Sequence, residues 1–197
     1  MYSHQVKVPK DRVAVIIGTE GAQKQELEEK TGTKISVDSH EGDISISGDD
    51  PLNLFVTREM IKAIGRGFNP QVAEKLLKQD VCFEMIKIRD FGDTKKDILR
   101  LKGRVIGHKG KSRETIEDMC DVDVVVYGKT IGIIGDAQHV PVARRAVESL
   151  LSGSPHASVY KWLEKQRHQL KKIDLIGDQL VKEQIKEEDD SSEDTDE

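Results

Sequence analysis

The stretch VIIGTEG at residues 15–21 has a second copy, RVIGHKG, at residues 104–110. Apolar positions after the turn keep the same separation of 89 residues: Leu27 and Ile116, Ile35 and Val124, Val37 and Val126. Gly48 then corresponds to Gly135, with the connecting hairpin two residues shorter in the second copy. The repeat predicts two copies of one small α/β unit, each built around a Gly-x-x-Gly turn between two helices.

Each unit is expected to run in the order β-α-α-β-β-α. In the first copy we expect a strand at 5–9, helices at 10–17 and 22–30, strands at 33–38 and 43–48, and a helix from 51 to about 65. In the second we expect a strand at 81–90, helices at 95–106 and 111–119, strands at 122–127 and 130–135, and a helix ending near 151. A short helix at 70–78 bridges the copies.

The C-terminal part of the chain does not belong to the repeat. A break at residues 152–155 precedes a basic helix predicted at 156–172, and a weaker helical pattern continues to 186. Residues 187–197 hold eight acidic groups and no basic ones, so residues 1–186 alone carry a net charge of +3. We expect this tail to be disordered, and its alternative roles are solubility or weak competition with RNA.

The expected class is α+β, with five segments. They are a first domain at 1–69, a linker helix at 70–79, a second domain at 80–152, a helical extension at 153–186 and the acidic tail at 187–197. No apolar run approaches the roughly 18 residues that span a bilayer, and the start lacks a signal-peptide core, so we expect a cytoplasmic protein. Cys82 and Cys120 form no CxxC pair and the histidines are scattered, so we expect buried thiols, no metal and no cofactor.

The two glycines of each turn predict a phosphate contact. Glycine lets the backbone approach an anion closely, and the following helix begins with its positive end at the turn. In the KH fold such a turn, placed in this order of elements, clamps the backbone of single-stranded nucleic acid. A tight helix–turn–helix without a ligand is the alternative, and the repetition favours nucleic acid. The candidate contacts are Gly18, Thr19, Glu20 and Gly21 in the first copy, and Gly107, His108, Lys109 and Gly110 in the second.

The second turn is expected to bind RNA more tightly than the first. No acidic residue occurs from residue 98 to 113, and six cations lie there: Arg100, Lys102, Arg104, Lys109, Lys111 and Arg113. The first turn has Glu20 where the second has Lys109, so the first copy is expected either to bind phosphate more weakly or to serve a protein partner. Ile106 and Ile116, with Val124, are candidates for contact with bases, and a core position is their alternative. Replacing Gly107 and Gly110 together by Asp is expected to abolish most RNA binding without unfolding the protein.

Other function classes fit the sequence less well. The aromatic content of 4% provides no exposed pair on which RRM or OB modules stack bases. Gly110-Lys111-Ser112 resembles the end of a P-loop, but that pattern requires glycine at position 105, which is Val105. We therefore expect no enzymatic activity.

The tandem units, the stretch LKGRVIGHKGKSR at 101–113 and the stretch HASVYKWLE at 156–164 resemble the Dim/Pno (Krr-like) ribosome-assembly proteins. The resemblance covers about residues 5–172, and an intact first Gly-x-x-Gly without a long N-terminal extension favours archaeal members. It implies a non-catalytic factor that binds near the 3′ end of small-subunit rRNA in the pre-small subunit and works with a PIN-domain endonuclease. By motif match, Gly107, His108, Lys109 and Gly110 would hold the RNA backbone.

Two further hypotheses remain open from the sequence. One is a protein–protein adaptor that uses the KH folds as a scaffold, and the other is a general RNA chaperone or RNA-degradation cofactor. Tyr160 and Trp162 lie two residues apart on the appended helix, so they cannot share one helix face. We expect one to pack inward and the other to bind a partner, with sealing of the domain end as the alternative, and we expect a monomer.

Overall fold

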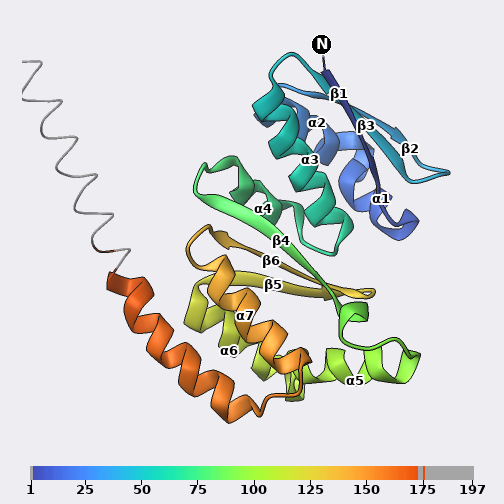
Figure 1. The fold of residues 1–197 in the computed structure, drawn as a ribbon. Coiled ribbons are helices and arrows are strands. Elements are labelled where there is room, and N and C mark those ends of the chain that lie inside the picture. The colour runs from blue at the N-terminus through green and yellow to red at the C-terminus, as the bar shows by residue number, and fades with distance from the viewer. Residues whose placement is uncertain (1, 173–174, 176–197) are drawn as a thin grey trace, which may run out of the picture.

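The computed structural model describes residues 2–172 and residue 175, and it contains two similar units stacked on one another (Figure 1). The first unit consists of β1 (Tyr2–Lys7), α1 (Lys10–Ile17), the 3-10 turn η1 (Thr19–Gly21), α2 (Ala22–Thr31), β2 (Lys34–Asp38), β3 (Asp43–Gly48) and α3 (Pro51–Gly65). Its strands form an antiparallel sheet in the order β1-β3-β2.

The second unit repeats this order. It consists of β4 (Val81–Lys87), the 3-10 turn η3 (Ile88–Asp90), α5 (Lys95–Ile106), the 3-10 turn η4 (His108–Gly110), α6 (Lys111–Cys120), β5 (Val122–Tyr127), β6 (Thr130–Asp136) and α7 (Val140–Leu151). The sheet order β4-β6-β5 matches that of the first unit, as the repeat predicts. The expected mixed α+β fold is thus confirmed, with two β-α-α-β-β-α units.

Three predicted elements had wrong boundaries. β1 spans Tyr2–Lys7 rather than residues 5–9, because its ladder with β3 runs from the pair Tyr2 and Gly48 to the pair Lys7 and Asp43. β4 ends at Lys87, opposite Thr130 where its partner β6 begins, and a 3-10 turn follows because no strand remains to pair with. The bridge between the units is one α-helical turn, α4 (Pro70–Ala73), followed by the 3-10 turn η2 (Glu74–Leu77).

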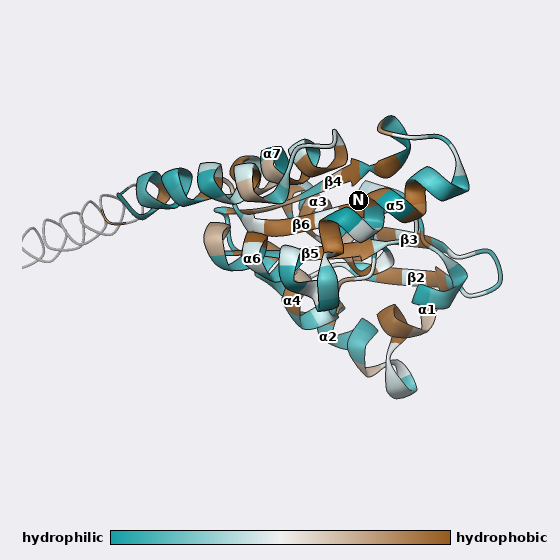
Figure 2. Ribbon diagram, turned by 90° about the horizontal axis from the view of Figure 1, so that it is seen from below, coloured by the Kyte–Doolittle hydropathy of each residue, from teal (hydrophilic) through white to brown (hydrophobic). Residues whose placement is uncertain are grey.

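The two sheets differ in what covers their outer faces. β1 exposes most of its residues, whereas every residue of β6 except the last is buried. The second sheet is covered on one face by its own helices α6 and α7 and contacts η2 on the other, where its residues share a hydrophobic core with α3 and α4, so it is a middle layer (Figure 1). Figure 2 shows the hydrophobic residues gathered in the strands and on the helix faces turned toward them.

Phe68 joins the two units. Its ring is fully buried and meets the ring of Phe83 edge to face, with 5.9 Å between centroids. A Cβ at Gly132 would lie 2.6 Å from Phe68 Cε2, so glycine at this position lets the ring lie on β6. Ile134 of the second sheet belongs to the core of the first unit. The units therefore share a buried interface rather than a flexible linker.

The predicted C-terminal helix is confirmed for residues 156–172. Val159 and Leu163 are buried in the core of the second unit, and Leu170 is buried further along the helix. The helix begins beside the end of α5 and runs along the second unit (Figure 1). The rest of the predicted extension, apart from residue 175, and the acidic tail at 187–197 lie outside the described residues.

Candidate nucleic-acid interface

The two Gly-x-x-Gly turns have almost the same backbone. Gly18 has φ 74° and ψ −179°, and Gly107 has φ 73° and ψ −179°. Gly21 and Gly110 both have φ 85°. The third residue of each turn, Glu20 or Lys109, has φ close to 50°, a left-handed conformation that costs energy for a residue other than glycine. The two copies therefore share the whole backbone of the turn, including the left-handed conformation of its third residue.

The first glycine of each turn is required by the helix that follows. A Cβ at Gly18 would lie 2.6 Å from Gln23 Cβ, and a Cβ at Gly107 would lie 2.6 Å from Ser112 Cβ and 2.8 Å from the Ser112 backbone nitrogen. Substitution of Gly107 by Asp would therefore destabilise the packing of the turn against α6. This contact argues against the expectation that the double Asp variant keeps its full stability.

The second glycine of each turn faces open space. A Cβ at Gly21 would meet nothing within 4 Å, and a Cβ at Gly110 would meet only Glu114 Oε1, at 3.6 Å. These glycines are the N-caps of α2 and α6, and neither helix has a side chain that caps its N-terminus. Such a helix start has N–H groups available for an anion. The turns can thus accept a phosphate on their open side.

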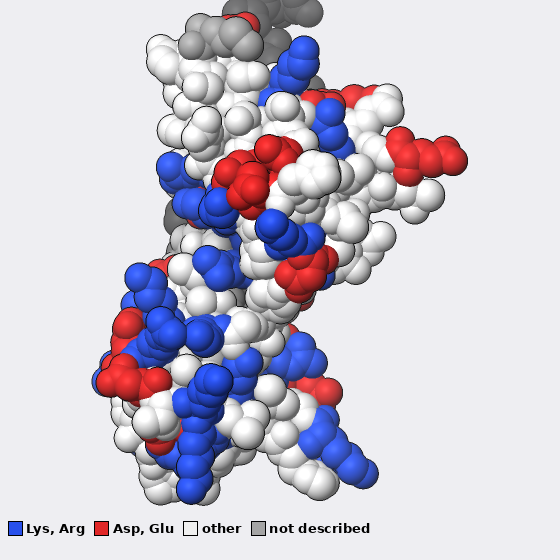
Figure 3. Space-filling model, turned by 90° about the vertical axis from the view of Figure 1, so that its right-hand side faces the viewer, with Lys and Arg blue, Asp and Glu red and all other residues white. Residues whose placement is uncertain are grey.

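The side chains at the turns differ in charge. His108 and Lys109 are exposed on the second turn, and Lys111 follows them, exposed at the start of α6. Thr19 and Glu20 are exposed at the corresponding positions of the first turn. Figure 3 shows Lys and Arg predominating over the lower half of one face, where the second unit lies, and a more mixed upper half. The same backbone therefore presents positive charge in one copy and a carboxylate in the other.

Arg104, predicted as an RNA contact, has a structural role. Its Nε donates to the carbonyl oxygen of Leu150 at 2.8 Å, and its Nη2 donates to that of Ser154 at 2.6 Å. Arg12 in the first unit makes two such bonds to carbonyls at and beyond the end of α3. Because the last carbonyls of a helix have no partner within the helix, these guanidinium groups stabilise the end of α7 and of α3.

The remaining predicted cations are available to different degrees. Lys109 and Lys111 are exposed, and Lys102 is partly buried. Arg100 keeps 59% of its side chain exposed and lies 3.4 Å from Asp97. Arg113 donates to the carbonyl oxygen of Val124 at 3.2 Å and pairs with Glu117 of its own helix. Its guanidinium group is therefore already bound to the edge of the second sheet.

A carboxylate caps the edge strand in both units. Glu28 Oε1 accepts from the backbone nitrogen of Ile35 at 2.6 Å, and Glu117 Oε1 accepts from that of Val124 at 2.8 Å. Burial raises the pKa of Glu117, against the lowering effect of the Val124 hydrogen bond. This pair was not predicted, although the shared spacing of seven residues in the two copies is visible in the sequence.

The three candidate base contacts have different surroundings. Ile106, directly before the turn, is partly exposed and remains a candidate. Ile116 is fully buried in the second core, as is Val124. Ile116 and the buried residues Ser112 and Cys120 lie four residues apart on α6, so one helix face packs inward. The assignment of Ile116 to RNA is therefore corrected to the core.

Both aromatic residues of the C-terminal helix are partly buried against the second core. Tyr160 meets the ring of His156, with 6.0 Å between centroids, and faces the second turn. Trp162 lies under the guanidinium group of Arg145, at 5.1 Å. The expected division into one buried and one free aromatic is not seen, and the helix does seal the second unit.

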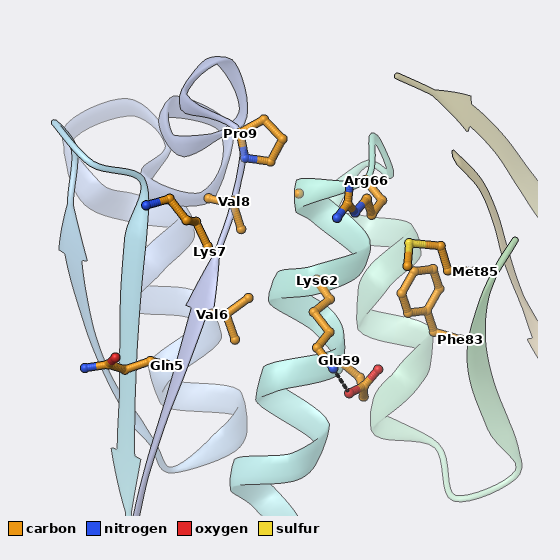
Figure 4. Close-up of a pocket in the computed structure, with 11 residues that line it drawn as sticks. Gln5, Val6, Lys7, Val8, Pro9, Glu59, Lys62, Arg66, Phe83 and Met85 are labelled. Atoms are coloured by element: carbon orange, nitrogen blue, oxygen red, sulfur yellow. Dashed lines mark hydrogen bonds and ion pairs between the residues drawn. The ribbon is translucent and has the colours of Figure 1, made fainter. Parts of the chain in front are cut away.

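A cleft of about 410 Å³ lies between the two units (Figure 4). Figure 4 shows Phe83 and Met85 of β4 side by side on one wall and the chain from Val6 to Pro9 on the other. Lys62 Nζ donates to Glu59 Oε1 at 2.8 Å, so one cation of the cleft is already paired with a carboxylate. This cleft has apolar walls and mixed charge, in contrast to the turn of the second unit.

The structure offers no metal centre in the part of the chain that it describes, since no group of three His, Cys, Asp or Glu residues lies close enough together. Cys120 is buried, and burial raises its pKa to about 12. Cys82 is only partly buried, and burial raises its pKa as well. None of the described helices is long and apolar enough to span a membrane.

Both units match models of known protein families. A KH domain model matches residues 3–63, and a model described as the eukaryotic-type KH domain, KH domain type I, matches residues 82–168. The second match extends past the predicted domain limit at 152 and includes most of the C-terminal helix. This agrees with the position of Leu163 in the second core.

Three known proteins place these units in one family. KH domain-containing protein MJ0443 of Methanocaldococcus jannaschii is 44% identical over 85% of this chain and 75% of its own. The chain aDim2p, in a crystal structure of an a/eIF2alpha-aDim2p-rRNA complex from Pyrococcus horikoshii, is 42% identical with a TM-score of 0.80, over 85% of this chain and 95% of its own. Pre-rRNA-processing protein PNO1 of Eremothecium gossypii is 35% identical over 56% of this chain and 42% of its own. The chain belongs to the Dim/Pno family of tandem KH-domain proteins, in the form found in archaea.

Proposed function

We propose that this chain is a non-catalytic RNA-binding factor of small-ribosomal-subunit assembly, and that its second turn holds the backbone of single-stranded RNA. The carrying observation is the uncapped start of α6 behind a turn that exposes His108 and Lys109. Backbone N–H groups and a cation together favour a phosphate, whatever the base. The first copy, with Glu20 at the same place, acts as an auxiliary surface.

The relatives support the biological setting of this proposal. One neighbour was solved in a complex with rRNA, and another is named for pre-rRNA processing. We extend the setting to binding near the 3′ end of small-subunit rRNA within the pre-small subunit, in the cytoplasm, as a monomer. A PIN-domain endonuclease that trims this end would be the protein partner. The adaptor and the general RNA chaperone remain the competing functions.

The second glycine of each turn provides the test. Gly110→Asp adds a carboxylate where a Cβ has room, and Gly21→Asp does the same in the first copy. Binding of the full chain to a labelled 3′-terminal small-subunit rRNA fragment should weaken about tenfold in Gly110→Asp, the loss of one charge-assisted contact, and much less in Gly21→Asp. Circular dichroism should show both variants folded.

Two further measurements separate the competing functions. A scrambled RNA of equal length should bind more weakly, whereas a general chaperone would bind both alike. If the protein is an adaptor, its affinity for the endonuclease should be the same with and without RNA. The two Asp variants should then also bind RNA as tightly as the wild type does. That last result, with folded proteins, would reject the second turn as the RNA site.

A further inference from the structure

A second pocket lies between the Gly-x-x-Gly turn at residues 107–110 and the C-terminal helix. Its volume is about 450 Å³, and nine described residues of α5, the turn, α6 and the C-terminal helix line it, none of them Asp or Glu. Three of its basic side chains, Arg100, His108 and Lys111, are exposed. A hollow with several cations and no carboxylate among these residues favours an anionic ligand.

Ser112 gives this pocket a buried polar group without a partner. The residue is 2% exposed, and among the described residues its Oγ makes no hydrogen bond. It lies in the first turn of α6, whose N-terminus no side chain caps. A buried hydroxyl without a partner is unfavourable, so its presence beside cations and helix N–H groups indicates a ligand that accepts hydrogen bonds.

The far wall of the pocket comes from the C-terminal helix. His156 Nε2 donates to the carbonyl oxygen of Arg104 at 2.8 Å, which fixes the start of this helix against α5. The Tyr160 ring packs edge to face against His156 and lines the pocket. A partly exposed aromatic ring beside a phosphate site is a surface on which a base can stack.

The first unit shares the turn and the uncapped helix start but lacks the buried hydroxyl and the wall formed by the C-terminal helix. Gln23 occupies the position of Ser112, is only partly buried, and its Nε2 donates to Glu26. After α3 the chain turns into α4, which packs toward the second sheet instead of returning along α1. The pocket is therefore not a general consequence of the repeated fold.

We propose that this pocket is a nucleotide subsite, which binds one phosphate of the RNA strand at Ser112 and Lys111 and stacks the attached base on Tyr160. The proposal rests on the proposed function, because the strand must first lie along the second turn. The C-terminal helix then contributes directly to the RNA interface, in addition to its place in the core. Because the turn and the helix contact successive parts of one strand, short RNA would lose this contribution.

Matched substitutions test the subsite. Ser112→Ala removes the hydroxyl without adding atoms and should weaken binding of the rRNA fragment about threefold, while leaving the unfolding midpoint unchanged or higher. Tyr160→Leu should weaken binding about tenfold, and Tyr160→Phe should retain wild-type affinity because it keeps the ring. Trp162→Leu, on the same helix but outside the pocket, should bind RNA as the wild type does.

The outcomes separate the subsite from the turn. If Gly110→Asp weakens binding but Ser112→Ala and Tyr160→Leu do not, the turn binds RNA and the subsite is rejected. If Trp162→Leu weakens binding as much as Tyr160→Leu, the helix acts only by packing, which also rejects it. RNA carrying 5-iodouridine should crosslink to the peptide that contains Tyr160. Equal protection of that peptide by uridine monophosphate alone would identify a free-nucleotide site and overturn the strand subsite.

Discussion

The turn at residues 18–21 and the turn at residues 107–110 have matching backbone angles but opposite charge at the third position. The elements around them match too, including the carboxylate that caps each edge strand. What differs is the surroundings, because the second unit gains a fourth helix, a sheet covered on both faces and a cluster of cations. The repeat therefore preserves the backbone that approaches a phosphate, while the cations and the added contacts are concentrated in one copy.

The largest expected difference between the two units is the stability that the C-terminal helix adds to the second. Leu163→Ala should lower the free energy of unfolding by about 3 kcal/mol, because Leu163 is fully buried in the second core. Leu99→Ala is the matched control, since Leu99 is 72% exposed on α5, and it should change stability by less than about 0.5 kcal/mol. Urea denaturation measures both. Equal small effects would mean that the helix is detached in solution.

Alanine at the glycines of each turn tests whether the backbones are equivalent. Gly18→Ala and Gly107→Ala should each cost about 2–3 kcal/mol, because the new Cβ meets the next helix at 2.6 Å in a left-handed conformation. Gly21→Ala and Gly110→Ala should each cost only about 1 kcal/mol, for the conformation alone. Thermal or chemical unfolding checks the four values. A clear difference between corresponding positions would contradict the match of the two turns.

Exchange of charge between the turns should change binding in opposite directions. Lys109→Glu should weaken RNA binding about tenfold, which corresponds to about 1.4 kcal/mol. Glu20→Lys should strengthen it by less than about threefold, because the first copy lacks the neighbouring cations. Loss of one phosphate contact should reduce the slope of log affinity against log salt by about 0.7. A slope unchanged by Lys109→Glu would show that Lys109 contacts no phosphate.

The turn, its charge and the order of the elements could be predicted from the sequence, because a repeat exposes local geometry twice. Ile116 was also predictable, since its spacing of four from Ser112 and Cys120 marks one buried helix face. Arg104 was not, because its two acceptors lie about fifty residues away, at positions that only the packing of α7 against α5 defines. The same holds for Phe68, whose site on β6 depends on how the two units pack together.

The smallest expected effect is at Glu28 and Glu117, the carboxylates that accept from the edge strand in each unit. Glu28→Ala and Glu117→Ala each leave a backbone N–H at the strand edge without its acceptor, which should cost about 1 kcal/mol in either copy. Glu117 adds a pH effect, because burial raises its pKa above the ordinary value of 4.5. A raised pKa in the folded state means that folding favours the protonated carboxyl. The stability that Glu117 contributes is therefore full below about pH 4.5 and is lost as the pH rises through the folded-state value.

Gln at position 117 keeps an acceptor for the Val124 N–H and does not titrate. The free energy of unfolding of the wild type minus that of Glu117→Gln should therefore fall as the pH rises from 4 to 7, as measured by urea denaturation at each pH. Arg113 opposes this trend, because its positive charge favours the carboxylate and is 3.3 Å away. A difference that rises with pH would show that Arg113 outweighs burial. Glu117 would then stabilise the strand edge mainly as a charged carboxylate paired with Arg113.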